Sequence, residues 1–231
     1  VLYALDTLKA FISNGLAERF YRVYSTMKKS SETKAQAVAN KSLKNICLSY
    51  LAVVPKYAHL VNEQYKFSDN MTDALAAITI SAKNNLAELP EQISHFEQKW
   101  SETTLVMDKW FSINAQINMP EIFHLLAKLQ KHELFSLQNP NRARALIGAF
   151  MMNNPRYFHC KSGEGYNFLT EQIIQLNTIN PQVASRLITP LLAFERYEPV
   201  RKALIKEKLE YLSVLPDLSR DLKEKVDAAL S

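Results

Sequence analysis

Apolar side chains recur along this chain every three or four residues, which is the spacing of one face of an α-helix. Between residues 2 and 27 this pattern predicts helix, with Gly15 marking either a break or a kink. The apolar positions in this stretch are Leu5, Leu8, Phe11, Ile12, Leu16, Phe20 and Val23. We expect the next helix to begin at Ser30-Ser31-Glu32, with a serine as its cap, and to stop or kink at Pro55.

The helical pattern continues to the C-terminus with short polar joints between its segments. A polar turn at 68–73 precedes an Ala-rich helix, and Pro90 and Pro120 each open another. The apolar and aromatic run Leu105–Phe111 is expected to be buried. The last helices are predicted at roughly 166–178, 198–214 and 217–230. Alternating β-branched runs are nearly absent and the chain has only 4 Gly, which favours an all-helical protein.

One pattern occurs twice, at Asn139–Phe150 and at Asn180–Leu191. Each copy opens with Asn-Pro, in which Asn caps a helix and Pro occupies its first position. The two openings, at Asn139 and Asn180, are 41 residues apart. This spacing is close to that of stacked helical-pair repeats. We therefore expect a right-handed superhelix of about twelve helices in stacked antiparallel pairs, an armadillo- or HEAT-like α-solenoid forming a single domain over residues 1–231.

Both Asn-Pro helices carry arginines near their start. Arg142 and Arg144 lie in the first two turns of one helix, and Arg186 lies in the second turn of the other. Stacked helices present such positions side by side, so these arginines could bind a carboxylate or a peptide carbonyl in a shared cleft. The alternative is that they pair with acidic residues of neighbouring helices. Arg144 is five residues after Asn139 and Arg186 is six after Asn180, so a shared cleft depends on helix rotation.

Charge and cysteine content narrow the choice of partners and compartment. The net charge of +5 results from 28 basic and 23 acidic residues that are interleaved along most helices. A nucleic-acid-binding protein would cluster its basic residues on one face, and the nearest clusters, Lys28-Lys29 and 196–208, are diluted by Ser or Glu. No apolar run is long enough to span a membrane. Two distant cysteines, Cys47 and Cys160, favour a reducing compartment, so we expect a cytoplasmic protein.

Familiar catalytic motifs are incomplete in this chain. His132-Glu133 begins a zinc-peptidase pattern whose second imidazole is missing, and an exposed polar turn is the expected alternative. His159 and Cys160 are adjacent in a loop without an Asn or Asp to orient them. Residues 162–165 (Ser-Gly-Glu-Gly) lack the Lys-Ser/Thr ending of a phosphate-binding loop. We therefore assign no catalytic residue and no metal ligand.

Several stretches of the chain together resemble the C-terminal helical domain of bacterial aminopeptidase N, a family of zinc metallo-aminopeptidases. The similarity extends in order from about residue 31 to the C-terminus, whereas residues 1–30 share only the helical pattern. The stretches that carry it are 41–47, 70–77, 105–111, 139–150, 163–171 and 180–191.

The resemblance implies that the chain is a piece of a larger, four-domain enzyme that removes N-terminal residues from peptides; the start at Val1, within a predicted helix, fits this expectation. In that family His-Glu-x-x-His and a later Glu hold zinc, and Gly-x-Met-Glu-Asn binds the substrate amine. Neither motif occurs here, so we expect zinc in the full-length enzyme, none in this chain, and no activity of the chain alone.

The resemblance also implies a role for this part of the enzyme. In the family, the helical lobe closes over the catalytic domain and limits access to the chamber, and Arg144 and Arg186 match arginines that face this chamber. The implied partners are the enzyme's own catalytic domain and peptide substrates, with neither nucleic acid nor membrane. The alternative is a free-standing helical-repeat scaffold that binds a protein partner.

Overall fold

The computed structural model describes residues 1–27 and 33–231, and every regular element in them is helical. The all-α prediction is therefore confirmed. The chain divides into two compact units, Val1–Lys99 and Trp100–Ser231, where the sequence analysis expects one repeat domain. The predicted helix start at Ser30-Ser31-Glu32 and the Lys28-Lys29 pair lie outside the described residues.

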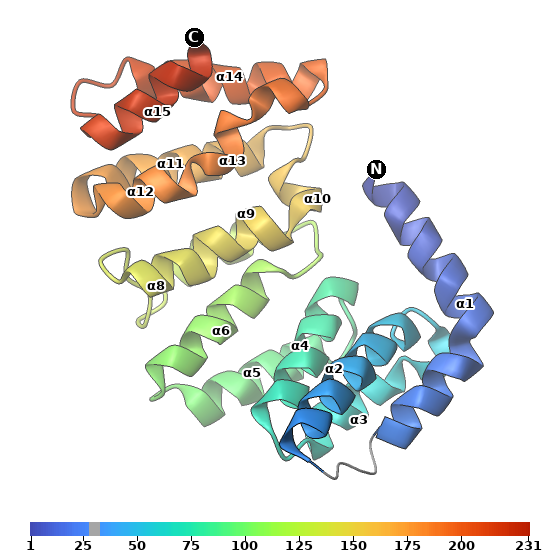
Figure 1. Ribbon diagram of the computed structural model, residues 1–231. Coiled ribbons are helices and arrows are strands. Elements are labelled where there is room, and N and C mark those ends of the chain that lie inside the picture. Colours follow the sequence, from blue (N-terminus) through green and yellow to red (C-terminus); the bar gives the residue numbers. More distant parts are fainter. Residues whose placement is uncertain (28–32) are drawn as a thin grey trace. The chain divides into compact units, whose positions relative to one another are not determined.

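The first unit is built around a long helix pair followed by shorter helices (Figure 1). Its elements are α1 (Leu2–Met27), α2 (Lys34–Leu51), η1 (Pro55–Tyr57), α3 (His59–Phe67), α4 (Met71–Asn84) and α5 (Leu89–Trp100). Thr33 caps α2 by accepting a hydrogen bond from the Gln36 amide at 3.2 Å. Leu48, Leu51 and Val61 lie at the centre of an apolar core that joins these helices. The α1 helix runs without interruption through Gly15, so of the two alternatives predicted there, a break and a kink, the break is absent.

The second unit is a stack of helical layers (Figure 1). Its elements are α6 (Thr104–Ala115), α7 (Ile122–Gln130), α8 (Pro140–Ala143), the π-helical turn η2 (Arg144–Gly148), α9 (Ala149–Asn153), α10 (Pro155–Phe158), α11 (Glu164–Ile179), α12 (Pro181–Leu187), α13 (Thr189–Leu192), η3 (Phe194–Arg196), α14 (Pro199–Ser213) and α15 (Arg220–Leu230). The layer α8–α9 is followed by α11 with α12, and then by α14 with α15. The last three helices predicted from the sequence are therefore present within a few residues of their expected ends.

Aromatic side chains fill the centre of the second unit. The Phe150 ring is fully buried and meets Phe123, Phe158 and Phe168 edge-on, with ring centroids 5.4–5.9 Å apart. Edge-to-face contacts of this kind add to the hydrophobic stabilisation of a core. The run Leu105–Phe111 is only partly buried, because Met107, Trp110 and Phe111 face this unit's core whereas Leu105 is 70% exposed.

The described residues form fifteen α-helical segments, more than the twelve or so expected, because some predicted helices are interrupted. The helix that opens at Asn180 is interrupted at Ile188, because Pro190 has no amide hydrogen to donate to the Arg186 carbonyl four residues earlier. The Thr189 hydroxyl donates to that carbonyl instead, at 2.8 Å. The helix that opens at Asn139 is interrupted by η2, where the Ala149 amide bonds to the Arg144 carbonyl five residues back.

Candidate functional site

The two Asn-Pro helices begin as their sequence predicts. The Asn139 side chain accepts hydrogen bonds from the amides of Asn141, at 3.0 Å, and Arg142, at 3.3 Å. The Asn180 side chain accepts from the Val183 amide at 3.2 Å. In each case the following proline occupies the first helical position, where its missing amide hydrogen costs no hydrogen bond. The local sequence thus fixes where each helix starts and, with it, the places of the arginines.

Arg142 is a buried structural residue. Its guanidinium donates from Nε to Asp108 Oδ1 at 2.7 Å and from Nη1 to the Leu134 carbonyl at 2.6 Å. It also lies over the Phe111 ring, 4.7 Å from the centroid, and only 3% of its side chain is exposed. Arg142 therefore follows the structural alternative, pairing with an acid of a neighbouring helix, and has no free face for a peptide. We therefore do not propose the substrate-side role that we expected for Arg142.

Arg144 is exposed and is the first residue of the π-helical turn. Its Nη1 donates to the side-chain oxygen of Asn141 at 3.1 Å, a neutral and exposed partner that leaves the positive charge uncompensated. Single π-helical turns are rare and occur frequently at functional sites. The wider turn shifts the residues after Arg144 out of regular α-helical spacing. The faces on which these residues lie therefore cannot be predicted by counting 3.6 residues per turn from Asn139.

Arg186 is exposed on α12 and forms no ion pair within the described residues. It lines an open groove of about 510 Å³ between α12 and α15, together with Asp221, Glu224 and Lys225. The Glu224 carboxylate is bonded to Arg220 at 2.8 Å. The Lys225 ammonium donates to the Ser185 carbonyl at 2.5 Å, which joins α15 to α12. Arg186 therefore has acidic residues in its groove but keeps its guanidinium available.

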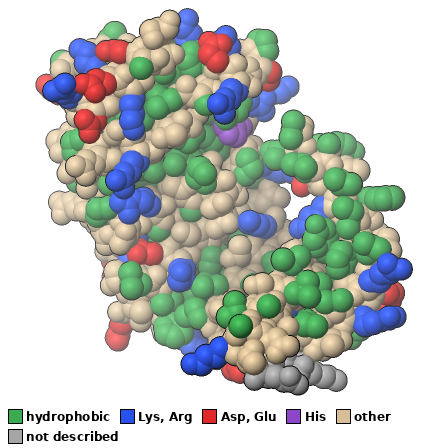
Figure 2. Space-filling model, in the orientation of Figure 1, with side chains coloured by type: hydrophobic (Ala, Val, Ile, Leu, Met, Phe, Trp, Pro, Cys, Tyr) green, Lys and Arg blue, Asp and Glu red, His purple; other side chains and the backbone are tan. Residues whose placement is uncertain are grey.

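The structure brings the helices of Arg144 and Arg186 into direct contact. A side chain at Gly148, at the end of the π turn, would lie 3.7 Å from both the Arg144 β-carbon and a methyl group of Leu187. Leu187 is the immediate neighbour of Arg186. Figure 2 shows Lys and Arg side chains on this face of the second unit, with acidic side chains among them. The arrangement can attract an anionic or carbonyl-bearing group.

The loop between α10 and α11 uses its polar residues for its own structure. The Tyr166 hydroxyl lies 2.9 Å from His159 Nδ1, and burial, with a further contribution from the Arg201 charge, lowers the pKa of His159 to about 4. The Cys160 thiol contacts the Ser162 hydroxyl at 3.1 Å, and Ser162 donates to the Glu164 carboxylate at 2.8 Å. These contacts form neither a thiol–imidazole pair nor a phosphate-binding loop.

His132 is not the exposed polar turn that we expected. Its ring is half-buried against Trp110 and Phe111, with centroids 5.2 and 5.5 Å away, and its Nδ1 accepts from the Leu134 amide at 3.1 Å. In residues 1–27 and 33–231 no group of three or more His, Cys, Asp or Glu side chains could hold a metal ion. The described residues therefore do not fit zinc, and no chemical step is assigned to a metal here.

The stacked helices define a protein of the armadillo-repeat class, and sequence comparison identifies its family. All residues from 1 to 231 match the family described as "Domain of unknown function (DUF3458_C) ARM repeats", and the chain belongs to it. The α-solenoid fold predicted from the sequence is thereby confirmed. Among the described residues, no helix has both the length and the apolar character needed to cross a membrane.

Known relatives of this chain are aminopeptidases. It is 41% identical over 224 residues to aminopeptidase N of Haemophilus influenzae and 37% identical over 229 residues to aminopeptidase N of Escherichia coli. The alignments cover 96% and 98% of this chain but only 26% of each relative. The crystal structure of Legionella pneumophila aminopeptidase A in complex with aspartic acid matches 97% of this chain and 28% of its own, with a TM-score of 0.88 and 26% identity. The resemblance to the C-terminal domain of bacterial aminopeptidase N is confirmed.

Sequence reasoning missed a polar pocket in the first unit. Tyr24, Lys44, Gln64 and Asp73 come from four different helices and line this pocket together. Their spacing follows no motif, and each residue type is common on helix surfaces. The one available signal is the run of capping residues at 68–73, which places Asn70 and Asp73 at the start of α4.

Proposed function

We propose that this chain is the helical lobe of a zinc-dependent aminopeptidase and that it controls the access of peptides to the catalytic chamber. The observation that carries the proposal is the pair of exposed arginines, Arg144 and Arg186, on two helices in contact within the second unit. Family membership and the aminopeptidase relatives support it. Because the chain spans about a quarter of those relatives, the zinc and the hydrolytic step are assigned to the remainder of the enzyme.

The proposed task of the two arginines is to position the substrate. A peptide whose amino end lies at the catalytic centre extends its carbonyl groups and its terminal carboxylate away from that centre. Guanidinium groups bind such acceptors through charge-assisted, often bidentate hydrogen bonds. Interactions with a remote part of the substrate change KM and length preference more than the chemical step, unless they strengthen in the transition state.

An apolar stripe on α1 supports the proposed contact with the enzyme's catalytic part. The side chains of Leu5, Leu8 and Leu16 follow helical spacing, and each is between 39% and 56% exposed. Ile12 continues the same stripe. Contiguous apolar surface of this kind marks an interaction site in a soluble domain. We propose that the part of the enzyme that carries the zinc site packs on this stripe.

The proposal is tested by comparing the complete protein with residues 1–231 alone. We expect zinc and hydrolysis of N-terminal residues in the complete protein and no hydrolysis by the 231-residue chain, measured with the same peptide and assay. A complete protein that contains no zinc peptidase motif and hydrolyses no peptide would favour the alternative, a scaffold that binds a protein partner.

A further inference from the structure

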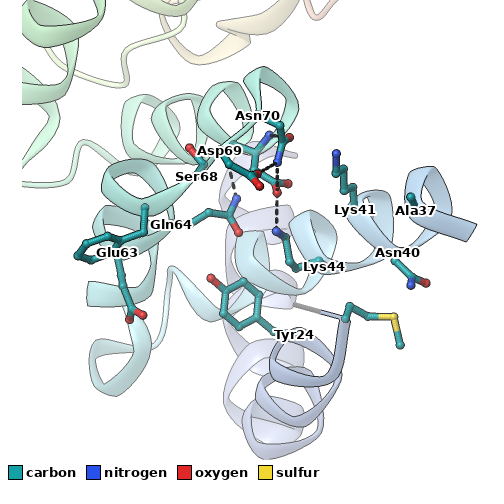
Figure 3. Close-up of a pocket in the computed structure, with 13 residues that line it drawn as sticks. Tyr24, Ala37, Asn40, Lys41, Lys44, Glu63, Gln64, Ser68, Asp69 and Asn70 are labelled. Atoms are coloured by element: carbon teal, nitrogen blue, oxygen red, sulfur yellow. Dashed lines mark hydrogen bonds and ion pairs between the residues drawn. The ribbon is translucent and has the colours of Figure 1, made fainter. Parts of the chain in front are cut away.

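The first unit contains a polar pocket that the proposed function does not use (Figure 3). It has a volume of about 490 Å³, a size typical of small-molecule sites, and residues from α1, α2, α3 and α4 line it. All of its lining residues lie between Tyr24 and Asp73, within one compact unit. Two of its atoms are buried polar atoms without a hydrogen-bond partner among the described residues, the Tyr24 hydroxyl and Gln64 Oε1.

The orientation of the Gln64 amide is fixed by its neighbours. Its nitrogen donates both hydrogens, to Asn45 Oδ1 at 2.7 Å and to the Asp73 carbonyl at 3.1 Å. Rotating the amide by half a turn would place an oxygen against these two acceptors, so Oε1 is the atom left without a partner. Gln64 is only 5% exposed, and a buried acceptor left without a donor is destabilising.

The Tyr24 hydroxyl complements this acceptor. Tyr24 is 2% exposed, and its hydroxyl points toward Gln64 in Figure 3. Burial, together with the negative charges of Glu63 and Asp73, raises the pKa of Tyr24 to about 12. The phenol therefore keeps its proton at neutral pH and can donate a hydrogen bond. A ligand that satisfies both atoms must carry an acceptor for Tyr24 and a donor for Gln64.

The surrounding charges are held in place by a buried ion pair. The Lys44 ammonium donates to Asp73 Oδ2 at 2.6 Å, and the side-chain amides of Asn45 and Asn70 donate to the same carboxylate at 3.0 Å. Asp73 is thereby fully engaged and is not available to bind a cation. Lys41 lies one helical turn before Lys44 on the same side of α2 and forms no ion pair with a described residue. The lining also includes Glu63 and Asp69, so the pocket presents charged groups of both signs beside one donor and one acceptor.

From this arrangement we propose that the pocket binds a free α-amino acid. The carboxylate of the ligand accepts from the Tyr24 hydroxyl and faces Lys41 and Lys44, while its ammonium group donates to Gln64 Oε1. The pocket volume leaves room for the side chain of the amino acid. This site lies within the first unit and is separate from the arginines of the second unit. The inference therefore does not depend on the proposed function.

The test is calorimetric titration of the 231-residue chain with L-alanine, and with acetate and methylammonium as the two halves of the ligand. We expect saturable binding of L-alanine and markedly weaker binding of either half. The Tyr24→Phe variant should bind at least about tenfold more weakly, the effect of losing one hydrogen bond to a charged group. Its fold should persist because the hydroxyl has no partner to lose.

Two further variants, one at the pocket and one outside it, test whether binding occurs at this site. Lys41→Ala, at the half-buried rim of the pocket, should also weaken binding. Tyr65→Phe is the matched control, because its hydroxyl bonds to the Gln92 carbonyl at 3.0 Å, outside this pocket, and its removal should leave the affinity unchanged. The proposal is overturned if L-alanine shows no saturable binding, if acetate binds as tightly as L-alanine, or if Tyr24→Phe retains the original affinity.

Discussion

Arg142 and Asp108 form a buried ion pair that joins α8 to α6, with Nε and Oδ1 2.7 Å apart. The Arg142 side chain is 3% exposed and that of Asp108 is 16% exposed. Two charges taken out of water in this way are stable only while each compensates the other. The pair therefore anchors α8, the segment directly before Arg144, to α6. Arg142 thus has a structural role.

Removing Arg142 should destabilise the second unit strongly. Arg142→Ala leaves the Asp108 carboxylate without its cation and the Leu134 carbonyl without its donor. We expect a loss of about 3–5 kcal/mol in the free energy of unfolding, the usual cost of breaking a buried pair. Urea denaturation followed by circular dichroism measures this change. Arg144→Ala is the control, because an exposed side chain should change stability by no more than about 0.5 kcal/mol. Equal stability of the two variants would contradict the structural role of Arg142.

Gly165 should be intolerant of any side chain. A β-carbon at this position would lie 2.1 Å from the Phe158 carbonyl oxygen, a distance at which the backbone of α10 or α11 must move. We expect Gly165→Ala to unfold or severely destabilise the second unit, measured as a fall in the thermal midpoint.

Replacing Gly15 by alanine should have the opposite effect to the same replacement at Gly165. A β-carbon there meets nothing within 4 Å, and the residue lies inside the continuous helix α1. Gly15→Ala should stabilise the protein by about 0.5–1 kcal/mol, because alanine loses less conformational entropy in a helix than glycine does. A destabilised Gly15→Ala variant would show that the helix is not continuous through this position.

His159 should make stability depend on pH between about 4 and 6.5. Burial, and secondarily the charge of Arg201, lowers the pKa of His159 to about 4 in the folded protein, whereas an unfolded histidine has a pKa of about 6.5. Between these values the unfolded chain binds more protons than the folded chain does. Stability is therefore fully present above pH 6.5 and falls as the pH decreases toward 4.

The measurement is the urea midpoint at pH 7 and at pH 5 for the original protein and for His159→Gln. The variant should lose less stability between the two pH values, because the group whose pKa differs between states has been removed. His124→Gln, which changes an exposed imidazole on α7, should keep the original dependence. An unchanged pH dependence in His159→Gln would contradict the assignment.

The sequence predicts the helices well because capping residues and apolar spacing are local signals. Asn139 and Asn180 cap helices as their Asn-Pro pattern indicates, and the terminal helices lie where periodicity places them. The burial of Arg142 could not be predicted from such local signals, because it depends on an ion pair with Asp108, 34 positions away in the chain. The continuity of α1 through Gly15 likewise has no local signal, since glycine has a low helix propensity.

The candidate sites also differ in whether local sequence signals predict them. Arg144 and Arg186 are candidates because of their positions near the start of the two Asn-Pro helices, and both are exposed, whereas Arg142 is buried. The π turn after Arg144 and the Gly148 contact with Leu187 arise from how two helices meet, for which the sequence carries no periodic signal. The pocket around Tyr24 and Gln64 is assembled from separate helices and becomes visible only when they are packed together.

The central claim, that Arg144 and Arg186 position peptide substrates, is tested most directly by steady-state kinetics of the complete enzyme. The Arg144→Ala, Arg186→Ala double variant should show a KM about tenfold higher for a peptide of several residues, consistent with the loss of charge-assisted hydrogen bonds. Its kinetics on a single-residue amide substrate should be little changed, because that substrate is too short to reach the arginines. Arg196→Ala, which removes another exposed arginine of the same unit, is the matched control and should leave both substrates unaffected. Equal effects of the double variant on the peptide and on the amide would contradict the account.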